Sequence, residues 1–374
     1  MNYYFDNAAT SFPKPSQVSY GIKKYLDTDG APYGRSFYNR AFKVSSTVED
    51  CRDLLSNILN ISTPERLTFT PNATFALNTL IQKFKYKHKK VLVSSMEHNG
   101  VMRPLQFLKN MYGIEYSILP SLPDGLIDLD KLRLNSPSIL NNSDLIIINH
   151  MSNVNGIIQP IKELKQIVGD IPVLLDCAQS AGHIPININD WNIEFAAFTG
   201  HKSLLGPTGT GALYTSKKFE IEPLLYGGTG SNSEFLSMPN EYPDLFEAGT
   251  QNIAGIYGLY EALKNKPEPL HTKENFTSLL NNLENTDSIT VHKAKKNEYQ
   301  GELFSLNHKK TTPSNFAMKL FSEFNIETRV GLHCAPMAHR HLGTSTEGTV
   351  RFALSPYHSE EDLEYLLNAI KSCI

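Results

Sequence analysis

The feature that most constrains the fold is an alternation, between about residues 48 and 200, of amphipathic patterns with short apolar runs. Helical spacing of apolar residues is seen over residues 48–59 and 161–169. The apolar runs have the length of strands and cover residues 89–95, 144–150, 171–176 and 195–200. Continuous apolar strands separated by amphipathic helices are typical of a mostly parallel sheet covered on both faces. The pattern predicts an α/β fold with ligand-binding residues at the carboxyl ends of the strands.

The length of 374 residues suits one large domain and a smaller companion. After about residue 255 a long helical stretch gives way to a polar, proline-containing segment, which predicts a domain boundary. We therefore expect a large domain over 15–255 and a small α+β domain over 256–374 that ends in a helix from about Ser359. The segment 1–14 is too short to be a domain, and we expect it to pack beside the small one.

The charge pattern excludes several classes of partner. The formal net charge is −3 and the basic residues are scattered, so we expect no binding to nucleic acid or to an anionic membrane. The N-terminus lacks a basic segment followed by an apolar one, and no apolar run reaches about 18 residues. These features predict a cytoplasmic protein whose partner is a small molecule.

The four cysteines lie far apart and form no CxxC pair, which argues against a disulfide framework or a zinc site. We expect no metal ion. Cys51 falls on a helical pattern, Cys177 follows an apolar strand and Cys373 is near the terminus, so these three are interpreted as buried or inert. Cys334 differs because it lies in a loop, GLHCAP, beside His333 and close to Arg329. A positive environment there would favour the reactive thiolate.

Two strand ends carry the residues that point to chemistry. Lys202 follows the apolar run 195–200 in the sequence TGHKS, where a strand-end cleft can hold the amine for a Schiff base. Asp176 ends another apolar run and is followed by Gln179. A carboxylate in this place can pair with the protonated pyridine nitrogen of pyridoxal 5′-phosphate (PLP), and Gln179 can reach the ring hydroxyl. Capping and turn roles are the alternatives for Asp176, and the combination with Lys202 favours the cofactor site.

Nearly the whole chain resembles the class V aminotransferases, PLP enzymes of fold-type I, and within them the cysteine desulfurase and selenocysteine lyase group. The resemblance rests on several ordered motifs: FDNAATSFPKP, NATFALN, SSMEHNGVMRPL, SNVNGIIQPI, LLDCAQSAGHIPI, AAFTGHKSLLGPTGTG, LFEAGTQN, RVGLHCAP and GTVRFALSP. It implies a homodimer with the active site between domains and subunits. Phe37, Tyr38 and Leu245 depart from the residues common in relatives, which leaves the substrate open.

The resemblance also implies a role for each matching residue. Lys202 would bind PLP covalently and move the Cα proton, Asp176 would face the pyridine nitrogen, and His98 would stack on the ring. Thr250 would reach the phosphate held by the other subunit. The remaining cofactor-binding residues implied are Ala73 and Thr74 at a helix start, Thr199 and His201 beside the phosphate, Gln179 on the ring oxygen, and Asn153 near the ring or the substrate.

Arg351 lies within an apolar strand, TVRFAL, and a guanidinium there needs a partner. A substrate carboxylate is one candidate, and a structural carboxylate elsewhere in the chain is another. Asn153 would assist in substrate binding. Cys334 matches the loop cysteine that attacks the substrate sulfur in desulfurases, and the short loop resembles the subgroup that needs a dedicated sulfur-acceptor protein.

The sequence thus predicts a PLP-dependent cysteine desulfurase that converts L-cysteine to L-alanine and passes sulfur from a persulfide on Cys334. Selenocysteine lyase or another C–S β-lyase is the first alternative. A class V transaminase would use Lys202 and Asp176 but needs no loop cysteine. The acceptor and the pathway stay open. The pathway could be iron–sulfur cluster assembly, RNA thiolation or selenium recycling.

Overall fold

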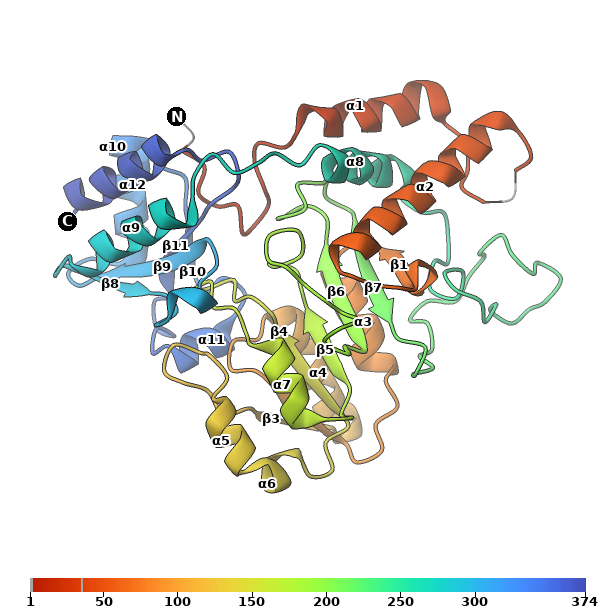
Figure 1. Cartoon of the computed structure of the whole chain (residues 1–374), viewed down its shortest axis with the longest axis horizontal. Helices are drawn as coiled ribbons and strands as arrows, with labels where there is room; N and C mark the ends of the chain where they lie inside the picture. The colour runs from red at the N-terminus through yellow and green to blue at the C-terminus, as the bar shows by residue number, and fades with distance from the viewer. Residues whose placement is uncertain (1–2, 35) are drawn as a thin grey trace.

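The computed structural model describes residues 3–34 and 36–374. Two sheets organise the chain (Figure 1). The larger contains β1 (Leu67–Thr70), β2 (Lys90–Val93), β3 (Glu115–Ile118), β4 (Leu145–Asn149), β5 (Val173–Asp176), β6 (Phe195–Thr199) and β7 (Gly211–Thr215). The smaller contains β8 (Ile289–His292), β9 (Leu303–His308), β10 (Arg329–Gly331) and β11 (Thr349–Ala353). The seven strands run in the order β1-β7-β6-β5-β4-β2-β3 and the four in the order β10-β11-β9-β8.

The helices flank both sheets. Their bounds are α1 (Ser16–Lys24), α2 (Asn39–Ile58), α3 (Ala73–Lys83), α4 (Asn99–Tyr112), α5 (Leu129–Leu134), α6 (Ser136–Leu140), α7 (Ile161–Val168), α8 (Ile253–Lys264), α9 (Lys273–Glu284), α10 (Pro313–Phe324), α11 (Pro336–His341) and α12 (Glu360–Ser372). Single turns of other helix types cover Tyr25–Asp29, Pro64–Arg66 and Asn297–Tyr299.

The predicted parallel sheet is confirmed. The four apolar runs form β2, β4, β5 and β6, which pair in parallel. Near one edge of the sheet, β7 pairs antiparallel with both of its neighbours, β6 and β1. Successive residues of one strand enter different cores: Ile146 packs in the cluster under α2, α7 and α8, whereas Ile147 packs in the cluster under α3 and α4. This alternation explains why the strands are apolar throughout.

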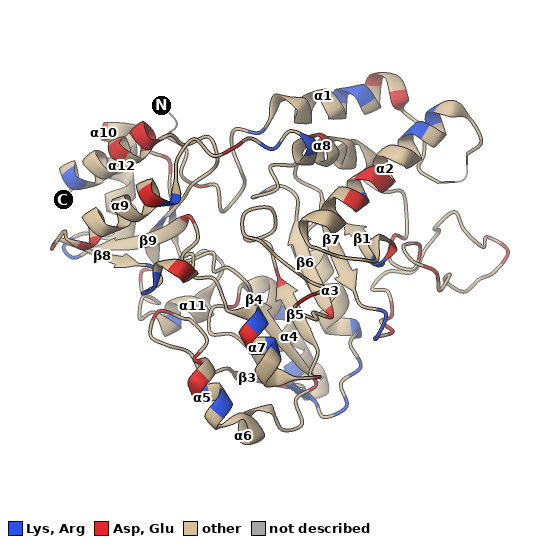
Figure 2. Cartoon of the chain, in the orientation of Figure 1, with Lys and Arg blue, Asp and Glu red and all other residues tan. Residues whose placement is uncertain are grey.

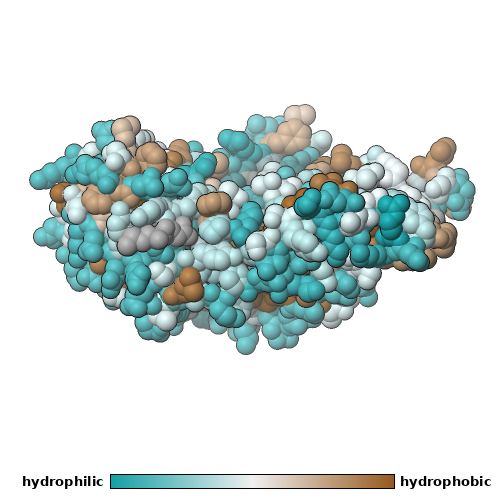
Figure 3. Space-filling model, turned by 90° about the horizontal axis from the view of Figure 1, so that it is seen from above, coloured by the Kyte–Doolittle hydropathy of each residue, from teal (hydrophilic) through white to brown (hydrophobic). Residues whose placement is uncertain are grey.

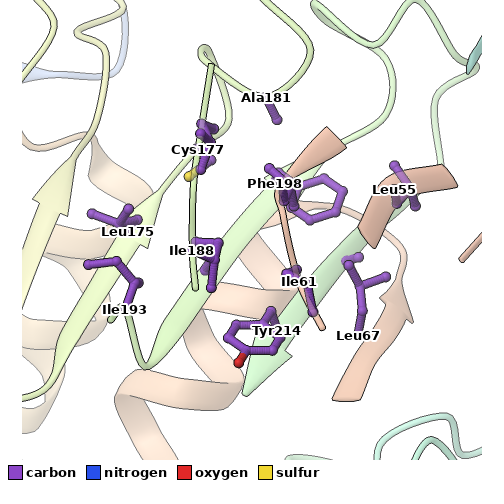
Figure 4. Close-up of a cluster of buried hydrophobic side chains, with 14 of the residues drawn as sticks. Leu55, Ile61, Leu67, Leu175, Cys177, Ala181, Ile188, Ile193, Phe198 and Tyr214 are labelled. Atoms are coloured by element: carbon purple, nitrogen blue, oxygen red, sulfur yellow. The ribbon is translucent and has the colours of Figure 1, made fainter. Parts of the chain in front are cut away.

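The first of these clusters is drawn in Figure 4, where Leu55 of α2 lies near Phe198 of β6 and Leu175 of β5 extends the same apolar layer. Cys177 belongs to this layer and is fully buried, and burial raises the pKa of its thiol. Burial likewise raises the pKa of Cys51. Both thiols therefore behave as the core residues that were predicted.

The N-terminal segment joins the four-stranded sheet. Phe5 packs in its core, and its backbone bonds with Glu327 at 2.9 Å and Ala353 at 2.8 Å. Both termini lie on this side of the molecule (Figure 1). Helix α8 packs instead against α1 and α2 and contributes Ile256 to the core of the large sheet. We therefore propose that the boundary between the two domains lies after α8 rather than at residue 255.

Acidic and basic residues are interspersed along the elements (Figure 2). The face seen from above is mainly hydrophilic with separate hydrophobic groups (Figure 3). Within the part of the chain that is described, none of the helices combines the length and the apolar character needed to cross a membrane.

Candidate active site

A pocket opens at the carboxyl ends of the central parallel strands. The pocket has an empty volume of about 500 Å³, part of which is open to solvent. It lies where the parallel sheet was expected to gather ligand-binding residues. The lining includes every predicted cofactor-binding residue except Thr250: Ala73, Thr74, His98, Asn153, Asp176, Gln179, Thr199, His201 and Lys202.

Lys202 lies in a tight loop after β6. The N–H of Gly200 donates to the carbonyl of Thr210 at 2.9 Å, and the carbonyl of Gly200 accepts from Gly206 at 2.8 Å. A Cβ atom on Gly200 would lie 2.3 Å from Thr210 Oγ1, so only glycine fits. Burial lowers the pKa of Lys202 to about 8, although Asp176 acts in the opposite direction. A substantial neutral fraction is available for nucleophilic attack.

Asp176 is the last residue of β5 and is 4% exposed. Its Oδ1 accepts a hydrogen bond from Ala178 N at 2.9 Å. Burial raises the pKa of Asp176, while this bond and the charge of Lys202 act against the shift. Gln179 lines the same pocket and its Nε2 donates to the carbonyl of Ala8 at 3.0 Å. The N-terminal segment therefore holds one side of the pocket.

His98 is the N-cap residue of α4. Its Nδ1 accepts a hydrogen bond from Gly100 N at 2.9 Å. Burial, together with the charges of Lys202 and Arg351, lowers the pKa of His98 to about 4. The imidazole is therefore neutral at physiological pH and carries its proton on Nε2. A neutral flat ring that lines the pocket is suited to stack on a cofactor.

The start of α3 forms another wall of the pocket. Asn72 caps the helix by accepting a hydrogen bond from Phe75 N at 2.9 Å, and Ala73 and Thr74 form the first turn. Backbone N–H groups of a first turn suit an anion. His201 is nearby in the lining, and its Nδ1 is buried without a hydrogen-bond partner among the described residues.

The structure does not show a phosphate contact for two of the predicted residues, Thr199 and Thr250. Thr199 lines the pocket, but its hydroxyl donates to the carbonyl of Thr210 at 3.1 Å and cannot donate to a phosphate at the same time. Thr250 is exposed and lines a separate pocket that also contains Phe75 and Phe246. It is therefore absent from the Lys202 pocket of its own chain, and its contact with a second subunit stays a prediction.

Arg351 has a carboxylate partner within the chain. Its Nη2 donates to Asp6 Oδ1 at 2.7 Å and its Nη1 donates to the carbonyl of Asn153 at 3.1 Å. The structural carboxylate was one of the two alternatives that the sequence left open. Nε of Arg351 and Oδ1 of Asn153 are both buried without hydrogen-bond partners among the described residues. These two atoms can receive a further polar ligand.

Cys334 is the exposed member of the four free cysteines. Its carbonyl accepts a hydrogen bond from Asn99 N at 2.7 Å, next to His98. Asn153 Nδ2 donates to the carbonyl of His333 at 2.6 Å. Both His333 and Cys334 adopt a positive φ, of 47° and 56°, which is uncommon for residues other than glycine. Two pocket walls therefore hold the loop in a conformation that L-residues rarely adopt.

The prediction that His333 makes the surroundings of Cys334 positive is wrong. His333 is 5% exposed and its Nε2 is paired with Thr349 Oγ1 at 2.9 Å. Burial and the charge of Arg351 lower the pKa of His333 to about 2, so the ring is neutral. Local spacing placed the histidine beside the cysteine, but the fold buries its side chain.

Two acidic residues near the site had little signal in the sequence. The signal for Asp6 was the arginine within an apolar strand, which needs a carboxylate partner; Asp6 itself is half-buried. Glu97 precedes His98 and is fully buried beside β4 and β5. Its only signal was its place between the run 89–95 and the predicted stacking histidine.

The chain is similar over almost its whole length to known proteins. The family described as aminotransferase class-V matches residues 3–366. A probable cysteine desulfurase of Methanothermobacter thermautotrophicus is 30% identical, over 97% of this chain and 92% of its own. The apo structure of the cysteine desulfurase from Thermococcus onnurineus NA1 aligns with a TM-score of 0.88 at 26% identity, over 99% of this chain and 94% of that one. The cysteine desulfurase CsdA from Escherichia coli gives a TM-score of 0.85 at 25% identity, with the same coverage.

These similarities extend over both sheets and agree with the pocket at the carboxyl ends of the parallel strands. The chain belongs to the class-V aminotransferase family, and the three relatives described above are named as cysteine desulfurases or probable cysteine desulfurases.

Proposed function

We propose that the protein is a PLP-dependent cysteine desulfurase, which converts L-cysteine to L-alanine and receives the sulfur on Cys334. One observation carries the proposal: an exposed cysteine is hydrogen-bonded through its backbone to Asn99, at the edge of the pocket that contains Lys202. A transaminase has no use for a thiol in this place. The relatives named cysteine desulfurase support the same activity.

The pocket fits PLP in its polar groups. The first turn of α3 and the unpaired Nδ1 of His201 suit the phosphate. The neutral ring of His98 suits a stacking contact, and the buried carboxylate of Asp176 suits a protonated pyridine nitrogen. Lys202 is the lysine within reach of these groups and would hold the cofactor covalently.

Bound PLP supplies an electron sink for the negative charge that develops at the substrate Cα. Lys202 removes and returns the proton at this carbon, a task that its lowered pKa favours because the neutral amine is the base. Asn153 Oδ1 and Arg351 Nε, the buried atoms without partners, bind the amino-acid part of the substrate. Asp6 keeps the guanidinium charged and oriented before the substrate arrives.

The sulfur transfer itself belongs to Cys334. Its thiolate attacks the substrate sulfur, so that a new S–S bond forms while the Cβ–S bond breaks. The electron pair of the broken bond stays on the substrate carbon skeleton, which takes up a proton and leaves as alanine. The persulfide on Cys334 is exposed and can pass its outer sulfur to an acceptor protein.

The proposal includes a cytoplasmic homodimer in which Thr250 of each chain contacts the phosphate in the other. Thr250 is exposed, and exposed apolar side chains of Leu225, Tyr226 and Phe235 lie in the same segment of the chain. An interface there would cover these side chains and bring Thr250 to a neighbour.

The test is to incubate PLP-loaded protein separately with cysteine, selenocysteine and cysteine sulfinate, and to measure alanine with the released sulfide, selenide or sulfite. With a thiol reductant present to reduce the persulfide on Cys334, a desulfurase produces alanine and sulfide from cysteine in equal amounts. Activity on selenocysteine alone would identify a selenocysteine lyase, and a keto acid that retains the sulfur would identify a transaminase. Either of these results overturns the proposal.

A further inference from the structure

Glu97 is a buried acid that the proposed reaction does not use. It lies between β2 and α4, directly before His98, with an exposed fraction of 0%. Its Oε1 accepts two hydrogen bonds, from Ser94 Oγ at 2.6 Å and from Asn149 N at 2.7 Å. Its Oε2 is buried and has no hydrogen-bond partner among the described residues. All the donors thus converge on one oxygen and leave the other for a proton.

Among the residues that the structure describes, no cation compensates the charge of Glu97. None of the ion pairs formed by described residues includes Glu97. The charged group that acts on it is Asp176, which raises the pKa of Glu97 in addition to the larger effect of burial, to about 8. An unpaired buried carboxylate is so unfavourable that such a group usually becomes neutral.

The groups that face Glu97 come from three neighbouring strands. Ser94 follows β2, Asn149 ends β4, and Asp176 ends β5 opposite Asn149 in the parallel register. Of these, only Asp176 is titratable. Lys202 and the N–H of Ala178 favour the charged form of Asp176, and Glu97 has no such cation. When two acids are close, the one with the cation keeps the charge and the other keeps the proton.

We propose that Glu97 is a positioning residue of the active site, a neutral carboxylic acid with its proton on Oε2 that leaves the negative charge of the site on Asp176. Its Oε1 also ties the end of β2 to the end of β4, and so fixes His98 relative to Asp176. The inference rests on the proposed PLP site. It adds which of the two buried acids, Glu97 or Asp176, holds a proton.

Infrared difference spectroscopy tests the protonation directly. In PLP-loaded protein at pH 7, the spectrum of unmodified protein minus that of Glu97→Gln should contain the C=O band of a protonated carboxyl group. The matched control is Glu194→Gln, because Glu194 is also buried but accepts two hydrogen bonds from the ammonium of Lys165, at 2.9 and 3.0 Å. This second difference spectrum should contain carboxylate bands only.

The pH dependence of stability gives a second readout. Between the ordinary pKa of 4.5 and a folded pKa of about 8, folded Glu97 holds a proton that the unfolded chain has released. Rising pH therefore favours the unfolded chain, by at most about tenfold in the folding equilibrium constant per pH unit. Glu97→Gln lacks this dependence, so its stability relative to unmodified protein should increase from about pH 4.5 to pH 8. A purely structural role would give a constant difference.

Carboxylate bands for Glu97 at pH 7, or a stability difference that does not change with pH, would overturn the inference. Glu97→Gln should also bind PLP within about tenfold of unmodified protein, since the amide keeps the shape of the neutral acid and one hydrogen bond of moderate strength is altered. Failure of the proposed desulfurase reaction would leave the infrared band and the pH dependence unchanged. The two proposals can therefore fail independently.

Discussion

At the scale of single residues, the site depends on side chains whose charged forms are disfavoured by burial. The pKa of Lys202 is lowered to about 8 and that of His98 to about 4, in both cases mainly by burial. Burial instead raises the pKa of Glu97, an acid, to about 8. Desolvation disfavours the charged form of each group, whatever its sign. The pocket thereby contains a base and a stacking ring, and the acid that we propose to be neutral lies directly before the ring in the chain.

Lys202→Ala should abolish covalent PLP binding and turnover, because the other pocket residues carry no primary amine. Borohydride reduction of PLP-loaded protein followed by peptide mass mapping will locate the label. Lys14→Ala is the matched control, since burial also lowers the pKa of Lys14 to about 8 while its ammonium donates to Ser11 Oγ at 2.8 Å. This variant should keep the label on Lys202. A label on any other lysine of the unmodified protein would contradict the assignment.

Cys334→Ala should bind PLP and cysteine normally but lose more than about a hundredfold in alanine release, because the nucleophile for the sulfur is gone. After one turnover without reductant, the unmodified protein should carry one extra sulfur atom on the peptide with Cys334. Cys373→Ala, which removes a buried thiol, should retain both alanine release and persulfide formation on Cys334. Full desulfurase activity in Cys334→Ala, with no persulfide, would move the assignment to a direct β-lyase.

At the scale of elements, a buried ion pair links α2 to the segment that carries Thr250. Arg52 Nη1 donates to Glu247 Oε1 at 2.8 Å, and the side chains are 1% and 4% exposed. The same oxygen accepts from Phe69 N of β1 at 2.7 Å. One carboxylate therefore fastens a helix and an edge strand to a segment that otherwise has no regular structure.

Glu247→Ala should lower the free energy of unfolding by about 3–5 kcal/mol, because it leaves the buried Arg52 guanidinium with only the half-exposed Glu49 as an ionic partner. Urea unfolding measures the change. The double variant Arg52→Met, Glu247→Leu should recover most of the loss, since no uncompensated charge remains. As a control, Glu65→Ala breaks an exposed pair with Lys217 and should cost about 0–1 kcal/mol. Equal costs for the two single variants would contradict a special role for burial.

At the scale of the whole molecule, the smaller sheet and the N-terminal segment support residues that line the pocket. Asp6 reaches Arg351 in β11, and Ala8 accepts from Gln179, which follows β5. The loop with Cys334 comes from the chain between β10 and α11. Thr250 does not line the pocket of its own chain, and its exposed position suits a contact with a second copy.

Thr250→Ala should lower PLP affinity by about two- to tenfold, the effect of one lost hydrogen bond, with little change in unfolding. The PLP-loaded protein should sediment as a dimer. Equilibrium dialysis and analytical ultracentrifugation measure the two properties. Thr346→Ala, which alters another exposed threonine, should leave both unchanged. A monomer that is saturated with PLP and fully active would refute the shared site.

The sequence by itself determined the parts of the protein that depend on local patterns. Apolar runs and helical spacing predicted β2, β4, β5 and β6, and therefore the strand ends that carry Asp176 and Lys202. The resemblance to a family added the residues that line the pocket. These features were accessible because each is encoded within a few neighbouring residues.

Only the tertiary structure decided which charges and protons the site keeps. It gave Arg351 the carboxylate of Asp6 as a partner, across 345 positions of sequence, and it buried His333 in a neutral state beside Cys334. It also left Glu97 without a cation next to Asp176. The reason is physical: desolvation and pairing depend on which distant segments surround a group, and local spacing carries no information about them.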